Sequence, residues 1–195
     1  MASTILVDKI DPQSGTALEI GTSGDTITVP SGATFNVAGT LQSGGAAVDN
    51  TPAFEVYQTS SQNPADNTYT KLTFTGETFD TNSAWSDSKF TVPSGFAGKY
   101  VFLLDAGGYD DNTGLDIFRL AIYKNGSAVK INTVLDTDGS SLQTAMACIS
   151  AVLDLSVGDY VEAYINANID SGTFTTLSNA SGTQTRFSGY KLIGV

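Results

Sequence analysis

The feature that most constrains the fold of this chain is a turn that leads directly into a strand with alternating large side chains. Residues 90–102 read FTVPSGFAGKYVF. Pro93 and Gly95 are residue types that favour turns. Tyr100 and Phe102 are two positions apart, which places both rings on one face of a strand. The stretch therefore predicts a core strand of an all-β domain.

Alternation followed by turn residues recurs further along the chain. Residues 118–123 alternate up to Asn125-Gly126, and this dipeptide between two alternating runs predicts a tight β-hairpin. Residues 145–165 predict two long strands that meet at Gly158-Asp159. No run shows the apolar period of a helix over three turns, so the whole chain is predicted to be all-β. Six side chains are expected in the core: Phe102, Leu120, Ile122, Leu153, Val161 and Phe187.

The order of these motifs resembles the globular head of complement first-component q and its relatives, the trimeric jelly rolls that include tumour necrosis factor. The family pattern has an apolar residue, a Pro/Gly turn and then Gly-x-Tyr-x-Phe, which Phe90, Gly98, Tyr100 and Phe102 meet. Its later features are an Asn-Gly hairpin, a strand leading into Gly-Asp-x-Val and a closing strand that begins Phe-Ser-Gly. They lie here at residues 125–126, 153–161 and 187–192.

This resemblance covers about residues 54–195. It implies a jelly-roll β-sandwich head, which we assign to residues 51–195, and it implies a homotrimer. Two features of the family pattern are not met. The sequence has no cysteine near the Pro/Gly turn, and the collagenous stalk that usually precedes the vertebrate heads is replaced by a different kind of segment.

That segment, residues 16–50, carries pairs of apolar residues at steps of eight to nine positions. The members are Leu18 and Ile20, Ile27 and Val29, Phe35 and Val37, and then Leu41. Strands this short cannot bury their apolar faces alone, so they need neighbouring rungs or neighbouring chains. We therefore predict an intertwined β-stem of three chains. Residues 24–41 also resemble the amino-terminal stem of virion fibre proteins from tailed bacteriophages. The alternative is a flexible Gly/Ser/Thr linker, against which the apolar periodicity argues.

Residues 1–15 precede this stem and are predicted to be an attachment peptide that joins the chain to other virion proteins. They hold one apolar run, residues 5–7, beside Asp8. This start lacks the basic residues and the longer apolar run of a secretory signal, and no stretch approaches the length of a membrane span. We expect synthesis in a host cytoplasm, no membrane insertion, and localisation in the virion.

Charge and composition exclude several classes of function. The net charge is −11 with nine Lys and Arg, and they form no basic cluster, which argues against nucleic-acid binding. The chain has no histidine, which excludes Ser-His and Cys-His catalysis and histidine-ligated metals. Pairs of carboxylates remain as a formal route to catalysis, but most aspartates lie in polar loops, so we predict no enzyme. The one cysteine, Cys148, is expected to be a small buried side chain.

Two acidic loops are candidates for ligand binding. Residues 105–116 are interpreted as a long Gly-rich loop in which Tyr109 stacks on a sugar. Asp110 and Asp111 would accept hydrogen bonds from the sugar hydroxyls or hold a bridging calcium ion. Asp136 and Asp138 form part of a calcium-loop pattern that lacks the third acid and the bidentate glutamate. Solvated turns are the alternative for both loops, and no cofactor other than calcium is considered.

Two further rings, Tyr69 and Trp85, also stand in turn-rich surroundings. They are either exposed platforms for a sugar or protein contact, or part of the core or the trimer interface.

Two functions follow from these observations. The favoured one is a bacteriophage structural protein, a trimeric tail fibre or spike that attaches to the particle by its amino terminus and binds a host surface glycan or protein by its head. The alternative is a decoration protein on a capsid or tail, such as a cement protein or head fibre, without specific receptor binding. Because jelly rolls bind through variable loops, the sequence does not separate the two.

Overall fold

The computed structural model describes residues 18, 20–39, 41–43, 46–47, 50–112, 114–135, 142–179 and 181–193. The chain divides into two compact units, residues 1–41 and 42–195, and each is considered by itself. Residues 1–15, the predicted attachment peptide, lie outside the described residues, so this assignment stays a prediction. Among the described residues, no helix is long and apolar enough to span a membrane.

The described part of the first unit, residues 18 and 20–39 with Leu41, contains no β-strand. The side chains of the predicted apolar pairs are all exposed in the single chain, with exposed fractions from 37% to 70%. Short apolar strands need neighbours to form, so the β-stem assigned to residues 16–50 stays a prediction about the assembled protein.

The second unit opens with a small hairpin, β1 (Gln42–Ser43) and β2 (Ala46–Ala47), and continues as two antiparallel sheets. We call them sheet I and sheet II. Sheet I has the order β11-β8-β14-β3-β5, with β13 paired to β8. Its strands are β3 (Ala53–Tyr57), β5 (Gly76–Asp80), β8 (Gly98–Asp110), β11 (Thr144–Leu155), β13 (Phe174–Thr176) and β14 (Arg186–Lys191).

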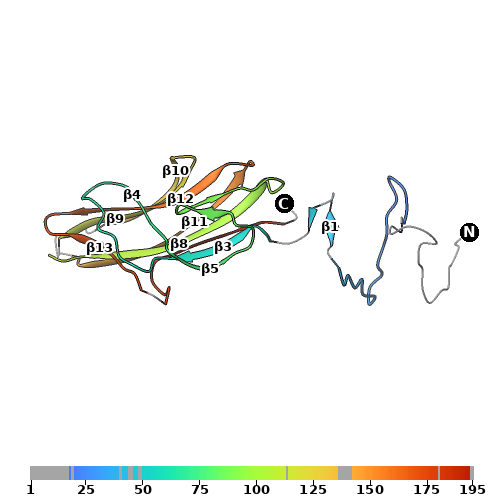
Figure 1. Ribbon diagram of the computed structural model, residues 1–195, viewed down its shortest axis with the longest axis horizontal. Helices are drawn as coiled ribbons and strands as arrows, with labels where there is room; N and C mark the ends of the chain where they lie inside the picture. The colour runs from blue at the N-terminus through green and yellow to red at the C-terminus, as the bar shows by residue number, and fades with distance from the viewer. Residues whose placement is uncertain are drawn as a thin grey trace, which may run out of the picture. The chain divides into compact units, whose positions relative to one another are not determined.

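Sheet II has the order β10-β9-β12-β7-β6, with β4 paired to β12. Its strands are β4 (Thr70–Lys71), β6 (Trp85–Ser86), β7 (Lys89–Thr91), β9 (Leu115–Lys124), β10 (Ser127–Leu135) and β12 (Tyr160–Ile169). Figure 1 shows the two sheets as the layers of a β-sandwich, with β3, β5, β8 and β13 in one layer and β4, β9, β10 and β12 in the other.

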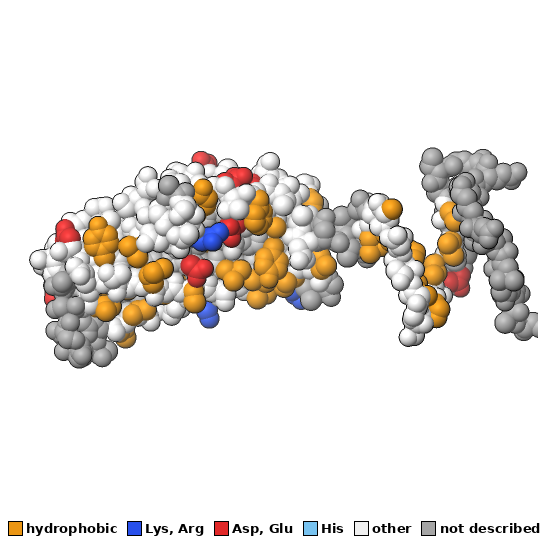
Figure 2. Space-filling view, turned by 90° about the horizontal axis from the view of Figure 1, so that it is seen from below, with side chains coloured by type: hydrophobic (Ala, Val, Ile, Leu, Met, Phe, Trp, Pro, Cys, Tyr) orange, Lys and Arg blue, Asp and Glu red, His pale blue; other side chains and the backbone are white. Residues whose placement is uncertain are grey.

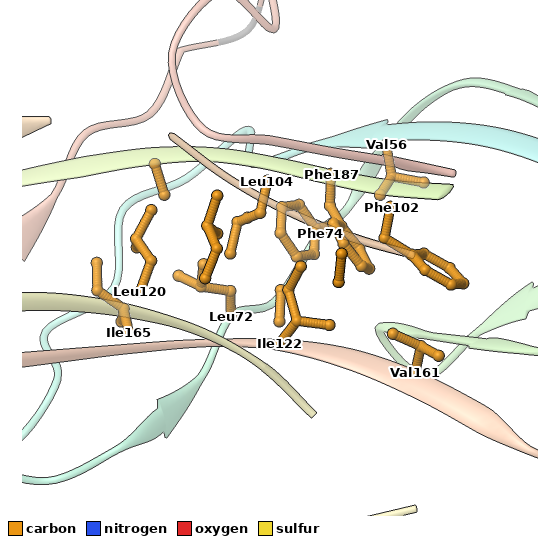
Figure 3. Packing of buried hydrophobic residues seen from close by; sticks show 14 of the residues in the cluster. Val56, Leu72, Phe74, Phe102, Leu104, Leu120, Ile122, Val161, Ile165 and Phe187 are labelled. Atoms are coloured by element: carbon orange, nitrogen blue, oxygen red, sulfur yellow. The ribbon is translucent and has the colours of Figure 1, made fainter. Parts of the chain in front are cut away.

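The core fills the space between the sheets because every second side chain of each long strand points inward. In Figure 3, Leu104 and Phe187 of sheet I point toward Leu120, Ile122 and Ile165 of sheet II. All five side chains are fully buried. Burial of large apolar side chains like these is the main contribution to the stability of such a sandwich.

Five of the six predicted core residues are buried: Phe102, Leu120, Ile122, Val161 and Phe187. Leu153 was predicted to be buried in the core, but it is only partly buried and packs against the margin of the core. It belongs to β11, which is the edge strand of sheet I, so sheet II covers its inward side incompletely. Cys148 was predicted to be buried, but it is exposed, because its side chain lies on the outward face of the same strand.

The predicted hairpin at Asn125-Gly126 joins β9 to β10. Both residues have positive φ angles, 50° and 77°, as a two-residue type I′ turn requires. The Asn125 side chain accepts a hydrogen bond from the backbone N–H of Tyr160 at 2.9 Å, so the turn is also tied to the start of β12.

Trp85 packs in the core rather than standing on the surface. Its ring stacks on Phe54 with centroids 4.9 Å apart and meets the edge of Phe74 at 5.8 Å. Tyr69, by contrast, lies on the outward side of sheet II, where its ring centroid is 6.2 Å from that of Tyr123.

Candidate functional site

Residues 105–110 form the end of strand β8, which corrects their assignment to a loop. Strand β9 begins at Leu115, so only residues 111–114 connect the two strands. The glycines there suggested a turn, but they serve close packing: a Cβ atom on Gly108 would lie 2.1 Å from the Phe174 ring. Strands β11 and β13 pair with β8 on its two sides here and hold it extended.

The three predicted binding residues in this region point in different directions. Tyr109 lies on the outward face of sheet I and is 38% exposed. Asp110 points inward and is fully buried, where its Oδ2 accepts a hydrogen bond from the Gly114 N–H at 2.6 Å. Its Oδ1 is buried without a hydrogen-bond partner among the described residues. Asp111 is exposed in the turn, and its Oδ1 accepts from the Thr173 N–H at 2.8 Å.

This arrangement makes Asp110 a carboxylate that fixes the turn, and in this conformation it offers no surface to a sugar lying on Tyr109. The described residues contain no group of three or more acidic or cysteine side chains that would hold a metal ion. Asp136 and Asp138, the predicted calcium residues, lie outside the described residues. Binding by Tyr109, Asp110 and Asp111 therefore stays a prediction.

The turn at residues 111–114 and the start of β3 at Ala53 lie at opposite ends of the sandwich. Strand β8 begins at the end where β3 starts, and there Tyr100 pairs with Lys191. It finishes at Asp110, at the opposite end. A ligand bound at residues 111–114 would thus be remote from the point where the chain enters the head at Ala53.

The outward face of sheet I is apolar over much of its length. Figure 2 shows the molecule from the side of β3, β5, β8 and β13, with apolar side chains spread along the sandwich and a few charged ones among them. Val152, Val101 and Tyr190 lie side by side on β11, β8 and β14, and Leu103 lies in the next outward row between Ser150 and Ser188.

Several of these side chains are exposed to a degree unusual for apolar residues: Leu103 is 41%, Met146 54% and Val152 64% exposed. The charges on the face include an ion pair between Arg186 and Glu55. Exposed apolar side chains that gather on one face, here interrupted by serines and this ion pair, are typical of protein contact surfaces.

The outward face of sheet II has a different composition, with four tyrosines and a set of fixed charges. The Tyr123 and Tyr164 rings stack with centroids 4.0 Å apart, and Lys89 lies over the Tyr160 ring at 5.2 Å. We call this surface the tyrosine platform. It comprises Tyr69, Lys71, Lys89, Arg119, Tyr123, Tyr160, Glu162, Tyr164 and Asn166.

Polar contacts hold the platform together. Lys71 Nζ donates to Glu162 Oε1 at 2.7 Å, and Arg119 Nη1 donates to Asn166 Oδ1 at 2.8 Å. Burial raises the pKa of Tyr164, and the neighbouring Glu162 carboxylate raises it further.

Sequence reasoning missed the platform, although part of it was visible. Tyr160, Glu162, Tyr164 and Asn166 alternate along β12, which is the pattern of one strand face. The partners on β4 and β9 come from distant parts of the sequence, and only the pairing of Tyr164 with Lys71 and of Asn166 with Arg119 brings them together.

The structure is similar to Eiger TNF from S. frugiperda, with a TM-score of 0.56, 10% sequence identity, and coverage of 75% of this chain and 96% of that chain. The fold is a C1q/TNF-like jelly roll.

Another solved structure with this jelly-roll likeness is the globular domain of zebrafish Complement 1qA protein. It has a TM-score of 0.49 and 18% identity, and it covers 72% of this chain and 97% of that chain. No family model and no curated protein sequence matches the chain. The likeness to Eiger TNF confirms the jelly-roll fold expected from the ordered motifs.

Proposed function

We propose that the chain is the subunit of a homotrimer whose contact surface is the outward face of sheet I. The observation that carries this proposal is the set of exposed apolar side chains on β8, β11 and β14, which includes Leu103, Val152 and Tyr190. C1q/TNF-like folds commonly trimerise, and a closed three-fold arrangement buries one such face per subunit without leaving an open end.

The seven exposed apolar side chains of residues 18–41 support the same assembly. Their spacing suits a stem in which three chains cover what one chain leaves exposed. Exposed apolar residues at regular intervals would be a liability in a permanent monomer.

We further propose that this trimer is a structural protein of a bacteriophage particle, a fibre or spike. Residues 1–15 attach it to other virion proteins, the stem spaces it, and the head binds the host surface. The spaced apolar stem and its likeness to fibre stems support this role, and the chain's chemistry supports binding rather than catalysis, since it has no histidine.

The oligomeric state tests the first part of the proposal. Light scattering of the purified full chain is expected to give three times the 20.3 kDa mass of one subunit. Leu103→Asp and Val152→Asp place a charge in the proposed contact and are expected to give monomers at micromolar concentration. Val157→Asp is the matched control, because the exposure of Val157 lies between those of Leu103 and Val152 but the residue is in the turn between β11 and β12. A monomeric wild-type chain would refute the trimer.

Labelling on the particle tests the second part. A chain lacking residues 1–15 is expected to form the trimer but to be absent from assembled particles. Antibody labelling of wild-type particles should mark the tip of the adsorption apparatus. An even distribution over the shell would instead favour the decoration role.

A further inference from the structure

We propose that the tyrosine platform of sheet II is the receptor-binding surface of the head and that its ligand is an acidic glycan. This inference rests on the proposed host-binding function and deepens it, because it assigns a site and a ligand class apart from the predicted binding residues Tyr109, Asp110 and Asp111.

The first argument is the arrangement of the rings. Tyr123 and Tyr164 stack at 4.0 Å with an interplanar angle of 29°, and Tyr69 lies 6.2 Å from Tyr123. Each ring is half-buried, so it is held in place and loses little conformational entropy when a ligand packs on it. Stacking covers one face of Tyr123 and one face of Tyr164, so the C–H groups of a sugar would pack on the parts of the three rings that stay exposed.

The second argument is the polar groups between the rings. Glu162 and Asn166 point outward yet are only 8% and 1% exposed. Lys71 and Arg119 hold them by hydrogen bonds of 2.7 and 2.8 Å. Glu162 and Asn166 are too buried to contact a ligand, so their part is to orient the Lys71 and Arg119 cations before a ligand arrives, which lowers the entropic cost of binding. Hydroxyl and carboxylate oxygens of an acidic sugar accept hydrogen bonds from such cations.

The third argument is charge, and it selects an acidic glycan over a neutral one. The platform carries three cations, Lys71, Lys89 and Arg119, and one carboxylate, Glu162, whereas the whole chain has a net charge of −11. In the described part of the chain, neither Lys89 nor Arg119 has a carboxylate within ion-pair distance. Arg119 in particular presents a planar group that recognises carboxylates well.

The location is compatible with the assembly. Sheets I and II present opposite faces of the sandwich, so a trimer that buries the outward face of sheet I leaves the platform in solvent. Three platforms per trimer would bind a repeating surface polysaccharide with avidity.

The experiment measures binding of the full-length trimer to a panel of immobilised polysaccharides. The panel holds polygalacturonate, a sialic-acid polymer and a phosphate-bearing teichoic acid, each beside its carboxyl-reduced or dephosphorylated counterpart, and polyglutamate as a polyanion without sugar. Variants are Arg119→Gln, Lys89→Gln and Tyr164→Ala. Lys191→Gln is the control matched in charge, because Lys191 pairs with the inward-facing Tyr100 and so lies outside both outward faces. Trimer mass and melting temperature are measured for each variant.

The wild-type trimer is expected to bind at least one acidic polysaccharide about tenfold or more tightly than its neutral counterpart and than polyglutamate. Arg119→Gln and Tyr164→Ala should each weaken this binding about tenfold, which corresponds to the loss of one aromatic or charge-assisted contact. Lys191→Gln should bind like wild type. Since Arg119→Gln retains the length and polarity of the side chain, it covers the case in which Tyr164→Ala does not fold.

Several results would overturn the inference: no binding to any acidic polysaccharide, equal binding of polyglutamate, or wild-type affinity in folded platform variants. Host-cell binding separates this inference from the proposed function. If wild-type trimers bind host cells and the platform variants bind them equally well, only the platform is refuted. If wild-type trimers do not bind host cells at all, the proposed function fails as well.

Discussion

Sheet I and sheet II bury the same kinds of side chain between them but present different kinds to the outside. Outward from sheet I stand Leu103, Met146 and Val152, while outward from sheet II stand stacked tyrosines and paired charges. The alternation that divides each strand into two faces is the same in both sheets. What differs is the composition of the outward face, and under our two proposals sheet I faces another subunit while sheet II faces solvent or a ligand.

The largest expected effect is a difference in stability between substitutions on the inward face and on the outward face of β8. Phe102 is fully buried on β8, with Phe187 5.9 Å away, whereas Leu103 beside it is exposed. Phe102→Ala should destabilise the chain by about 3–5 kcal/mol through lost burial and a cavity. Leu103→Ala should cost less than about 1 kcal/mol. Urea unfolding in the Val152→Asp background measures both without a contribution from subunit dissociation.

Equal costs for these two substitutions would contradict the register of β8. A slip of one residue exchanges the two faces of a strand, and the division between core and contact surface would then have to be redrawn.

We expect a smaller difference in stability between substitutions that break the ion pairs on the two outward faces. The Lys71 and Glu162 side chains are 29% and 10% exposed, and those of Arg186 and Glu55 are 38% and 26% exposed. Glu162→Gln leaves a half-buried lysine without its carboxylate and should cost about 1–2 kcal/mol. Glu55→Gln on sheet I should cost less than about 1 kcal/mol, because solvent screens that pair more strongly. Urea unfolding at neutral pH is the measurement, and the reverse ranking would show that burial is not the deciding factor.

The smallest expected effect is on stability at acid pH, and it comes from the turn that connects β11 of sheet I to β12 of sheet II. Hydrogen bonds from Asn125, Lys124 and the backbone of Ser156 hold the pKa of Asp159 at about 2, below its usual 3.8. A lowered folded-state pKa contributes stability above about pH 4 that is lost as the pH falls toward 2. Asp159→Asn should therefore flatten the stability curve between pH 4 and pH 2. Thermal melts across this range test it, and an unchanged curve would rule out this contribution.

Much of the fold could be predicted from the sequence because it is encoded locally. The turn at residues 93–95, the alternation through Phe102 and the Asn125-Gly126 hairpin each depend on neighbouring residues, and the structure confirms the strands around them. The core residues of the central strands followed from the same alternation. Leu153 did not, because its exposure depends on β11 being an edge strand, and the position of a strand in a sheet is not a local property.

The candidate site was much less predictable. Residues 105–110 look like a loop because two glycines interrupt the alternation, yet pairing with β11 and β13 makes them a strand. The tyrosine platform combines Tyr69, Tyr123 and Tyr164, which are separated by about forty to fifty residues in the sequence. Only the order of strands in sheet II and their register make these three rings neighbours.

The exposed position of Cys148 gives this protein a built-in reporter. The thiol lies on the outward face of β11, opposite Asp105 of β8, and it is the only thiol in the chain. If sheet I is the contact face, a fluorescent maleimide will alkylate dissociated subunits quickly and assembled ones slowly. The rate of labelling then measures the rate of subunit exchange in the natural sequence, and no residue has to be introduced.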